Sequence, residues 1–147
     1  MPASPPPNMP RISPNVFYDD PAAALEWLGK AFGFTTRMSM PGPDGSVLHA
    51  EMEVEDSAIM LSPTSGAEAW KSPRSLGGAV TLGLYIFVDD VDAHYARARS
   101  AGATILSEPE DMFWGDRTYL VEDLEGHRWT FAKHVRDVAP EDMKPPA

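Results

Sequence analysis

The sequence contains no cysteine among its 147 residues. Disulfide bonds and thiolate chemistry are therefore excluded, and a hydrophobic core must hold the fold together. No apolar run approaches the roughly 18 residues that a membrane-spanning helix needs, so we expect no membrane partner. The first ten residues, MPASPPPNMP, lack the charged and apolar regions of a signal peptide, and we therefore expect a cytoplasmic protein.

Positive charge is also scarce. Twelve Lys and Arg stand against 22 Asp and Glu, which gives a formal net charge of −10. Nucleic-acid binding needs a basic surface, so nucleic acid is excluded as a partner. An acidic surface favours a cationic small ligand, although an ordinary solvated acidic surface has the same composition. The length fits one domain with a sizeable core.

The strongest positive signal is an internal repeat of about 70 positions. The residues that match in type are Phe17, Asp19, Asp20 and Ala23, followed by Phe87, Asp89, Asp90 and Ala93. In each copy an alternating apolar run leads into two aspartates, which can cap a helix, and a glycine (Gly33 or Gly102) then ends that helix. Three more strand-like runs follow each time. The repeat therefore predicts an α+β fold of two tandem βαβββ modules.

The predicted elements follow from apolar periodicity and turn residues. The first module has strands at 12–18, 34–40, 47–54 and 57–62 and a helix from 21 to 32; the second has strands at 81–88, 104–106, 117–122 and 127–134 and a helix from 91. We place the modules at about 11–62 and 79–136, within a single domain 11–136. A disordered Pro-rich tail, 1–10, and a C-terminal tail, 137–147, flank that domain.

One stretch carries a family resemblance. Residues 114–129, WGDRTYLVEDLEGHRW, are similar to the WGxR…DPxGH segment of glyoxalase/bleomycin-resistance-like proteins, with Leu124 in place of the usual Pro. With the repeated strand–DD–helix–Gly pattern, the chain resembles the vicinal oxygen chelate superfamily over about residues 12–134. The ending HVRDVAPEDM resembles a bacterial glyoxalase-like subgroup, often of unknown function. The resemblance implies a curled mixed sheet around a cleft, and a homodimer.

The resemblance also gives a test for a metal. Family enzymes hold a divalent cation with His and Glu side chains from the first and fourth strands of each module. The corresponding positions here are Ser13, Met60, Gly83 and Thr130. Hydroxyls are weak ligands, the Met thioether is soft and neutral, and Gly has no side chain. We therefore predict no metal at this place and no cofactor.

Strand alternation predicts a cleft lined by aromatic and polar side chains, with Trp129 on the opposite face in the core. The predicted ligand-binding residues are Asn15, Phe17, Tyr85, Phe87, Trp114, Arg117, Tyr119, Arg128 and Thr130. Such a lining suits a flat apolar ligand oriented by a few polar groups. Two tryptophans have alternatives: Trp114 covers the cleft mouth or packs in a dimer contact, and Trp70, in the long loop 62–79, is a lid or a surface residue.

His49 and Glu51 form the pair best suited to catalysis. Their spacing places both on one face of a strand, where the carboxylate would keep the imidazole poised as a general base. The alternative is a solvent-facing polar edge. Among the other histidines, we expect His127 to make a fold-stabilising hydrogen bond and His94 to be exposed on its helix.

The sequence as a whole favours a small-molecule-binding protein of this family with a metal-free cleft, which sequesters an aromatic or cationic compound. The alternative is a metal-dependent lyase or dioxygenase-like enzyme of the same superfamily. A protein that serves only protein–protein interaction would have no ligand-sized cavity.

Overall fold

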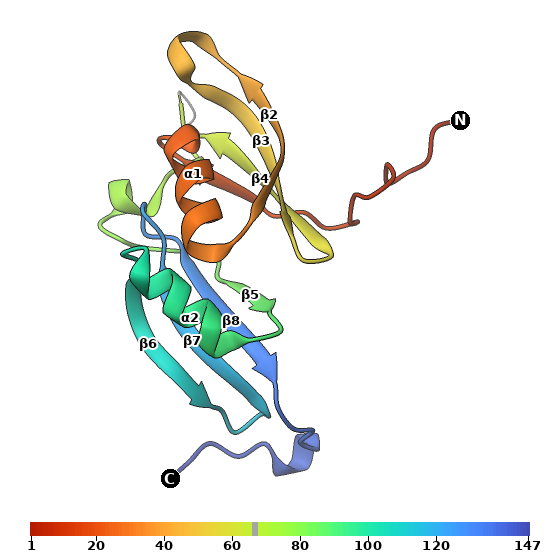
Figure 1. The fold of residues 1–147 in the computed structure, drawn as a ribbon, viewed down its shortest axis with the longest axis vertical. Coiled ribbons are helices and arrows are strands. Elements are labelled where there is room, and N and C mark those ends of the chain that lie inside the picture. Colours follow the sequence, from red (N-terminus) through yellow and green to blue (C-terminus); the bar gives the residue numbers. More distant parts are fainter. Residues whose placement is uncertain (66–67) are drawn as a thin grey trace. The chain divides into compact units, whose positions relative to one another are not determined.

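Each half of the chain forms the same succession of one strand, one helix and three strands (Figure 1). The computed structural model describes residues 1–65 and 68–147, and the chain divides into a first unit, Met1–Gly78, and a second unit, Ala79–Ala147. The first unit contains β1 (Asn15–Tyr18), α1 (Pro21–Phe32), β2 (Thr35–Pro41), β3 (Val47–Val54) and β4 (Ser57–Pro63). The second contains β5 (Leu84–Phe87), α2 (Val91–Ser100), β6 (Thr104–Asp111), β7 (Asp116–Glu122) and β8 (Arg128–His134).

The two sheets have the same topology. Their strand orders are β1-β4-β3-β2 and β5-β8-β7-β6. The first strand of each unit runs parallel to the last, and the other pairs are antiparallel. In register, Asn15 pairs with Met60 in the first sheet and Tyr85 pairs with Thr130 in the second. The predicted pair of βαβββ modules is therefore confirmed.

Both helices begin where the repeated aspartates predict. The Asp20 carboxylate accepts a hydrogen bond from the N–H of Ala23 at 3.1 Å, and the Asp90 carboxylate accepts from that of Ala93 at 3.0 Å. Each bond satisfies a backbone donor that the first helical turn leaves unpaired. Gly33, with φ of 76°, ends α1 in the left-handed conformation that glycine adopts without strain.

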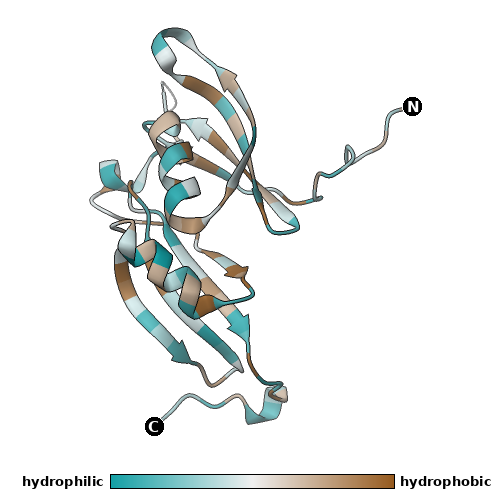
Figure 2. Ribbon diagram, viewed as in Figure 1, coloured by the Kyte–Doolittle hydropathy of each residue, from teal (hydrophilic) through white to brown (hydrophobic). Residues whose placement is uncertain are grey.

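Each helix covers one face of its own sheet (Figure 1). Less and more exposed residues alternate along β5 and along most of β3, and Figure 2 shows hydrophobic and hydrophilic residues mixed along the strands. In the first unit Tyr18, Leu28, Met52 and Leu61 are fully buried. In the second, the fully buried core includes Tyr119, Trp129 and Phe131, and the predicted core position of Trp129 is confirmed.

Some strand boundaries differ from the prediction. Strand β1 begins at Asn15 rather than at residue 12, because Pro14 has no N–H to donate, although its carbonyl accepts from Met60 N at 2.8 Å. Strand β6 extends to Asp111 instead of ending at residue 106. Its register against β7 shifts between Ser107 and Glu110, which hides the alternation in the sequence.

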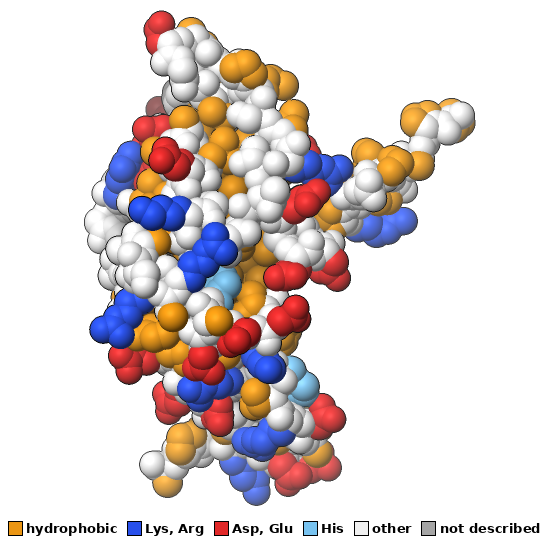
Figure 3. Space-filling model, viewed as in Figure 1, with side chains coloured by type: hydrophobic (Ala, Val, Ile, Leu, Met, Phe, Trp, Pro, Cys, Tyr) orange, Lys and Arg blue, Asp and Glu red, His pale blue; other side chains and the backbone are white. Residues whose placement is uncertain are grey.

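The loop predicted at 62–79 contains a short 3-10 helix, Pro73–Leu76, and residues 66 and 67 of that loop lie outside the described residues. Across the described part of the chain, no helix is both long enough and apolar enough to cross a membrane. Acidic and basic side chains are interspersed with apolar patches on the face shown in Figure 3.

Candidate functional site

The helix-free face of the second sheet, opposite α2, carries a group of aromatic side chains. Tyr85 and Phe87 on β5 are 44% and 55% exposed, and their ring centroids lie 5.5 Å apart at an interplanar angle of 67°. Thr130 pairs with Tyr85, so it lies on the same face. Arg128, also on β8, lies 3.4 Å from a carboxylate oxygen of Glu122, its partner in the β7–β8 register.

A chain of hydrogen bonds holds these aromatic rings. The indole N–H of Trp114 donates to the Tyr85 hydroxyl oxygen at 3.1 Å, and the Tyr85 hydroxyl donates to Asp116 Oδ2 at 2.6 Å. His134 Nδ1 lies 2.8 Å from Asp116 Oδ1, and its Nε2 lies 2.7 Å from Asp137 Oδ1. We call Tyr85, Trp114, Asp116, His134 and Asp137 the aspartate network. The buried carboxylate of Asp116 thus orients an aromatic group and an imidazole together.

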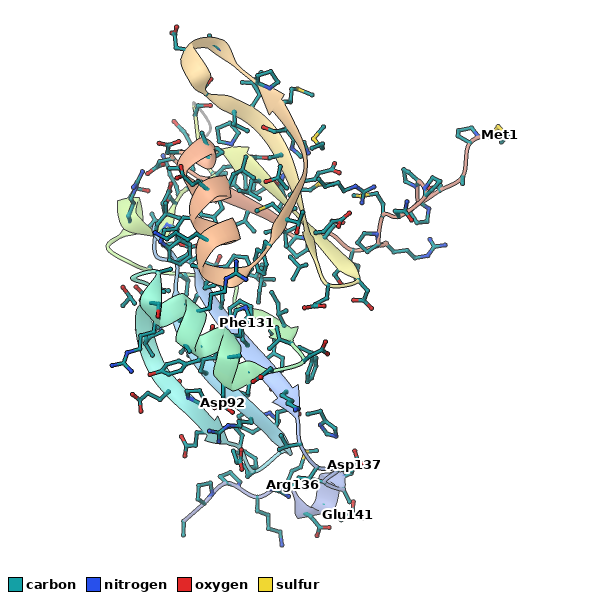
Figure 4. The ribbon with its side chains drawn as sticks, in the orientation of Figure 1. Met1, Asp92, Phe131, Arg136, Asp137 and Glu141 are labelled. Atoms are coloured by element: carbon teal, nitrogen blue, oxygen red, sulfur yellow. The ribbon has the colours of Figure 1, made fainter. Side chains whose placement is uncertain are left out.

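Gly115 explains why Trp114 and Asp116 occupy these places. The Gly115 carbonyl accepts from the N–H groups of Val135 and Arg136 at 2.9 and 3.1 Å, which ties the segment after β8 to the start of β7. The φ of Gly115 is 103°, and a Cβ there would collide with the Arg136 carbonyl oxygen. Figure 4 labels Arg136 and Asp137 in this closing segment. Gly115 of the WGD sequence therefore holds the segment after β8, which carries Asp137, next to the aspartate network.

The network shifts the titration of two of its members. Burial, aided by the hydrogen bond to Asp116, raises the pKa of Tyr85 to about 12, so this hydroxyl keeps its proton at neutral pH. The hydrogen bonds to Asp137 and then to Asp116 raise the pKa of His134, because both carboxylates favour the imidazolium form. Both ring nitrogens of His134 lie within hydrogen-bond distance of a carboxylate, so the protonated form can donate to both.

The helix-free face of the first sheet, opposite α1, is more mixed. It carries Asn15 and Phe17 on β1, Met60 on β4, and His49 and Glu51 on β3. His49 Nε2 lies 3.7 Å from Glu51 Oε2, so the structure places the two candidate catalytic residues side by side. On the other side of that carboxylate, Arg37 Nε of strand β2 lies 3.8 Å from Glu51 Oε1.

Trp70 lies against this first sheet. Its ring is stacked on Phe17, with centroids 4.3 Å apart and an interplanar angle of 9°. The segment that carries it is fastened to Asp19, which accepts from the Thr64 hydroxyl at 2.6 Å and from Arg74 Nε at 2.9 Å. Both bonds lower the pKa of the Asp19 carboxyl, and the bond from Thr64 has the larger effect.

The residues at the family's metal positions do not fit a divalent cation. Two of the positions expected from the sequence, Ser13 and Gly83, precede β1 and β5 and lie outside the sheets. The residues of β1 and β5 that pair with the other two positions, Met60 and Thr130, are Asn15 and Tyr85. An amide, a thioether, a phenol and a hydroxyl make a poor donor set for such a cation. Nor do three or more His, Cys, Asp or Glu side chains gather as a cation's ligands would anywhere in residues 1–65 and 68–147.

The prediction was wrong about the face of Arg117 and Tyr119. In the β7–β8 register Leu120 pairs with Thr130, so Leu120, and not Tyr119, shares the helix-free face. The Tyr119 hydroxyl lies 2.5 Å from His94 Nδ1 on α2, and burial raises the pKa of Tyr119 above its usual value.

Arg117 likewise points to the helix side. Its Nη2 lies 3.1 Å from Asp92 Oδ1 at the start of α2, where Figure 4 labels Asp92, and its Nη1 lies 3.1 Å from Asp111 Oδ1. His94, expected to be exposed, is half-buried, with its ring centroid 4.0 Å from that of Phe131. Alternation along one strand does not show which of its two faces the helix covers; the pairing of β7 with β8 decides that.

The second half of the family motif, DLEGH, serves the fold. Asp123 Oδ1 accepts from the N–H groups of Glu125 and His127, both at 3.0 Å, and Asp123 Oδ2 accepts from the Trp129 indole at 3.0 Å. One carboxylate thus shapes the β7–β8 turn and fixes a core tryptophan. The His127 bond is made by its backbone N–H, so the hydrogen bond expected of the histidine side chain stays a prediction.

Asp116 and His134 were not among the predicted site residues. A sequence pattern could have indicated them. The two residues pair across the β7–β8 ladder, and a carboxylate opposite a histidine on one face of a hairpin is a recognisable pattern. Asp137 gives no such signal, since it lies beyond the last strand in a segment predicted as a tail.

Comparisons with known proteins agree with this fold. The family model of the glyoxalase/bleomycin resistance protein/dioxygenase superfamily matches residues 11–131. An uncharacterized protein of Mycobacterium bovis is 36% identical over 138 residues, covering 92% of this chain and 90% of its own length. The crystal structure of TioX from Micromonospora sp. ML1 is similar at 34% identity and a TM-score of 0.70, with 84% of this chain and 98% of that chain covered.

A more distant structure, a glyoxalase/bleomycin resistance protein/dioxygenase from Nocardioides, is 21% identical with a TM-score of 0.64 over 89% of this chain and 87% of its own. At that identity the likeness concerns the fold alone. The two-unit topology, the family match over residues 11–131 and the relatives above 30% identity lead to one conclusion. The chain belongs to the glyoxalase/bleomycin resistance protein/dioxygenase superfamily.

Proposed function

We propose that this chain binds a planar aromatic or cationic small molecule on the helix-free face of its second sheet, without a divalent metal. The observation that carries the proposal is the aspartate network, which holds the Trp114 and Tyr85 rings in place beside the exposed Phe87. Rings fixed before binding lose little conformational freedom when a ligand stacks on them. Sequestration of the compound would then be the function.

Charge supports a cationic ligand. The formal net charge is −10, and the Asp116 carboxylate contacts the Tyr85 hydroxyl of the aromatic group, while that of Asp137 lies beyond His134. Aromatic faces attract cations through their quadrupole, with about 0.5–2 kcal/mol per contact depending on desolvation. Where His134 is protonated, its positive charge offsets part of the carboxylate charge, and the aromatic rings then supply the attraction.

A second candidate function rests on His49 and Glu51. The 3.7 Å separation of His49 Nε2 from Glu51 Oε2 suits a general base of a lyase or dioxygenase-like enzyme on the first sheet. The two functions differ in turnover. If His49 is the base, His49→Ala abolishes turnover and leaves ligand affinity within a few-fold; equal loss of affinity and turnover would reject the catalytic role.

The experiment is a calorimetric titration of the full chain, after EDTA treatment, with three probes. Proflavine is a planar aromatic cation, acridine at pH 7.5 has the same ring system without the charge, and tetraethylammonium is a cation without a ring. We expect saturable binding in the order proflavine, acridine, tetraethylammonium. Phe87→Ala should weaken proflavine binding about tenfold. Leu82→Ala, a change at a 67% exposed residue of the same unit, is the matched control and should leave it unchanged.

Absence of binding by all three probes would overturn the proposal. Binding that appears only with added divalent cation would overturn its metal-free part and favour the metal-dependent enzyme.

The homodimer and the cytoplasmic location stay predictions. Sedimentation of the purified chain at two concentrations tests the homodimer.

A further inference from the structure

Strand β2 carries two exposed methionines that the aspartate network does not involve. Met38 and Met40 are 37% and 48% exposed. In the β2–β3 register Met38 pairs with Glu51 and Met40 pairs with His49, so both methionines lie on the helix-free face of the first sheet. The register shifts just before Met38 and just after Met40. Irregularities of this kind re-aim side chains and are frequent beside functional sites.

A third methionine lies on the other side of the same histidine. Met60 of β4 pairs with Glu51 and is half-buried on this face. Met40 is directly opposite His49, where Cα atoms lie about 4.5–5.5 Å apart. Met38 and Met60 are the diagonal neighbours of that histidine on its two sides, at about 7–8 Å, which long side chains can span. His49 therefore lies among three thioethers from the two adjoining strands.

The imidazole of His49 is turned toward these side chains. Its Nε2 lies 3.7 Å from Glu51 Oε2, and Glu51 stands in the row of the sheet that also contains Met38 and Met60. This separation is too long for a hydrogen bond. In the tautomer that carries its proton on Nδ1, the Nε2 atom therefore offers a lone pair to a cation. The side chain is 28% exposed, so an ion can reach it.

The formal charges beside the thioethers offset each other. Arg37 Nε lies 3.8 Å from Glu51 Oε1, and Arg37 Nη1 donates to the Asn8 carbonyl at 2.6 Å. The guanidinium is thus held between a carboxylate and a backbone oxygen, and the carboxylate is engaged with it. The donors that remain for a cation are neutral, namely one imidazole nitrogen and the thioether sulfurs. Soft neutral donors of this kind select Cu(I) among the biological metal ions.

We propose that Met38, Met40, His49 and Met60 form a binding site for one Cu(I) ion. His49 Nε2 and the Met40 sulfur are the principal ligands, and the other two thioethers complete the coordination. An ion bound there takes the lone pair that a general base needs, so this site and the catalytic role of His49 exclude each other in one molecule. The site shares no residue with the aspartate network, so it succeeds or fails separately from the aromatic binding proposed above.

The test uses Ag(I), which has the charge and the ligand preference of Cu(I) and is stable in air. Silver nitrate is titrated into the full chain, 13C-labelled at the methionine methyl groups, in chloride-free buffer at pH 7.5, and the methyl signals are followed by NMR. We expect one equivalent to shift the signals of the three site methionines. The signals of Met52, buried on the opposite face of β3, and of Met143 should not move.

Two further titrations test the ion itself. Cu(I), kept reduced by ascorbate, should be withdrawn from its bicinchoninate complex by one equivalent of the chain. Zn(II) should leave the methyl signals unchanged, because thioethers are poor ligands for it.

Substitutions separate the ligands. Met40→Leu and His49→Gln should each weaken Ag(I) binding about tenfold or more, whereas Met38→Leu and Met60→Leu, at the diagonal positions, should each weaken it about threefold. Leucine keeps the volume of methionine, so these changes leave the packing nearly intact. Met143→Leu is the matched control, since Met143 is 39% exposed and lies in the other unit, and it should have no effect.

Four results would each overturn the inference. They are the absence of saturable Ag(I) binding, an affinity that Met40→Leu leaves unchanged, an equal loss in Met143→Leu, and displacement of Ag(I) by an equal concentration of Zn(II).

Discussion

The two units share a topology but hold their helices differently. All of α1 and α2 is described: α1 buries five residues, namely Pro21, Ala24, Leu28, Ala31 and Phe32, whereas α2 buries Val91 and Ala98. Polar contacts supplement the smaller apolar area of α2, from His94 to Tyr119, from Tyr95 to Glu108 and from Asp92 to Arg117. Apolar docking depends on buried area and packing, while polar docking also depends on individual atoms and on pH. Single-atom substitutions should therefore affect the second unit more than the first.

The same contrast holds on the helix-free faces. In the second unit one carboxylate, Asp116, fixes the rings through directed hydrogen bonds. In the first unit Trp70 is held by ring stacking, and its segment by Asp19, at the edge of the sheet. The same fold therefore holds exposed aromatic side chains by hydrogen bonds in one unit and by ring stacking in the other. Substitutions that remove one kind of contact in one unit test this difference.

The largest effect is expected from Asp123→Ala. This change removes the acceptor of two turn N–H groups and of the buried Trp129 indole, so we expect the free energy of unfolding to fall by about 3 kcal/mol. Urea denaturation measures it. Asp56→Ala is the matched control, because Asp56 lies in the β3–β4 turn and is exposed, and it should cost about 0.5 kcal/mol or less. Similar losses in both variants would remove the contrast between the hairpins.

Tyr119→Phe is expected to have the next largest effect. It deletes a single oxygen, the one that contacts His94 Nδ1, from a fully buried side chain, and should cost about 1 kcal/mol of stability. Tyr95→Phe, on α2 itself, deletes a hydroxyl that is 3.2 Å from an exposed carboxylate of Glu108 and should cost less than about 0.5 kcal/mol. If the two losses were equal, the buried polar contact would not be what fastens α2.

The dependence of stability on pH should differ between the two units. The effect should be smaller than that of Tyr119→Phe, because the two groups concerned, His134 and Asp19, are partly exposed. The pKa of His134 is raised in the folded state, so its stabilisation is complete below the unfolded value of 6.5 and is lost as pH rises through the folded pKa. The pKa of Asp19 is lowered from 3.8, so its stabilisation is present above that value and is lost as pH falls through the folded pKa. The thermal midpoint between pH 6 and 9 measures the first effect.

Substitutions assign these pH effects. His134→Gln should flatten the alkaline decline of the thermal midpoint and leave the acid side unchanged. Asp19→Asn should remove its share of the decline below pH 4 and leave the alkaline side unchanged. An alkaline decline that persists at full size in His134→Gln would show that the aspartate network does not contribute it.

The sequence was sufficient for the fold because its decisive signals are local. A pair of aspartates before Ala23 or Ala93 and a glycine after the helix act within a few residues, and strand alternation needs a single strand. The faces of Arg117 and Tyr119 were wrong because they depend on which residue of β8 each one pairs with. That register is a tertiary property, set here by the turn around Asp123.

The candidate site divides in the same way. Tyr85 and Phe87 were placed correctly on the face opposite the helix, since alternation along β5 determines their orientation. The contact of His134 with Asp137 could not be predicted, because it depends on a chain reversal after β8 that Gly115 anchors from 20 residues earlier. Local patterns thus give the aromatic lining, while the hydrogen bonds that fix it come from long-range packing.

The smallest effect is expected from substitutions in the two hairpin turns, β3–β4 and β7–β8. In the β3–β4 turn the left-handed position is occupied by Glu55, with φ of 53°, whereas the β7–β8 turn places Gly126 at φ of 93°. A side chain in that region costs roughly 1–2 kcal/mol, and the extra freedom of glycine in the unfolded chain offsets part of the gain from removing it. Glu55→Gly should therefore stabilise the chain by about 0.5 kcal/mol in urea denaturation, and Gly126→Ala should destabilise it. A loss of stability in Glu55→Gly would mean that contacts of the Glu55 side chain outweigh its backbone strain, and that the first unit's turn is as well adapted as the second's.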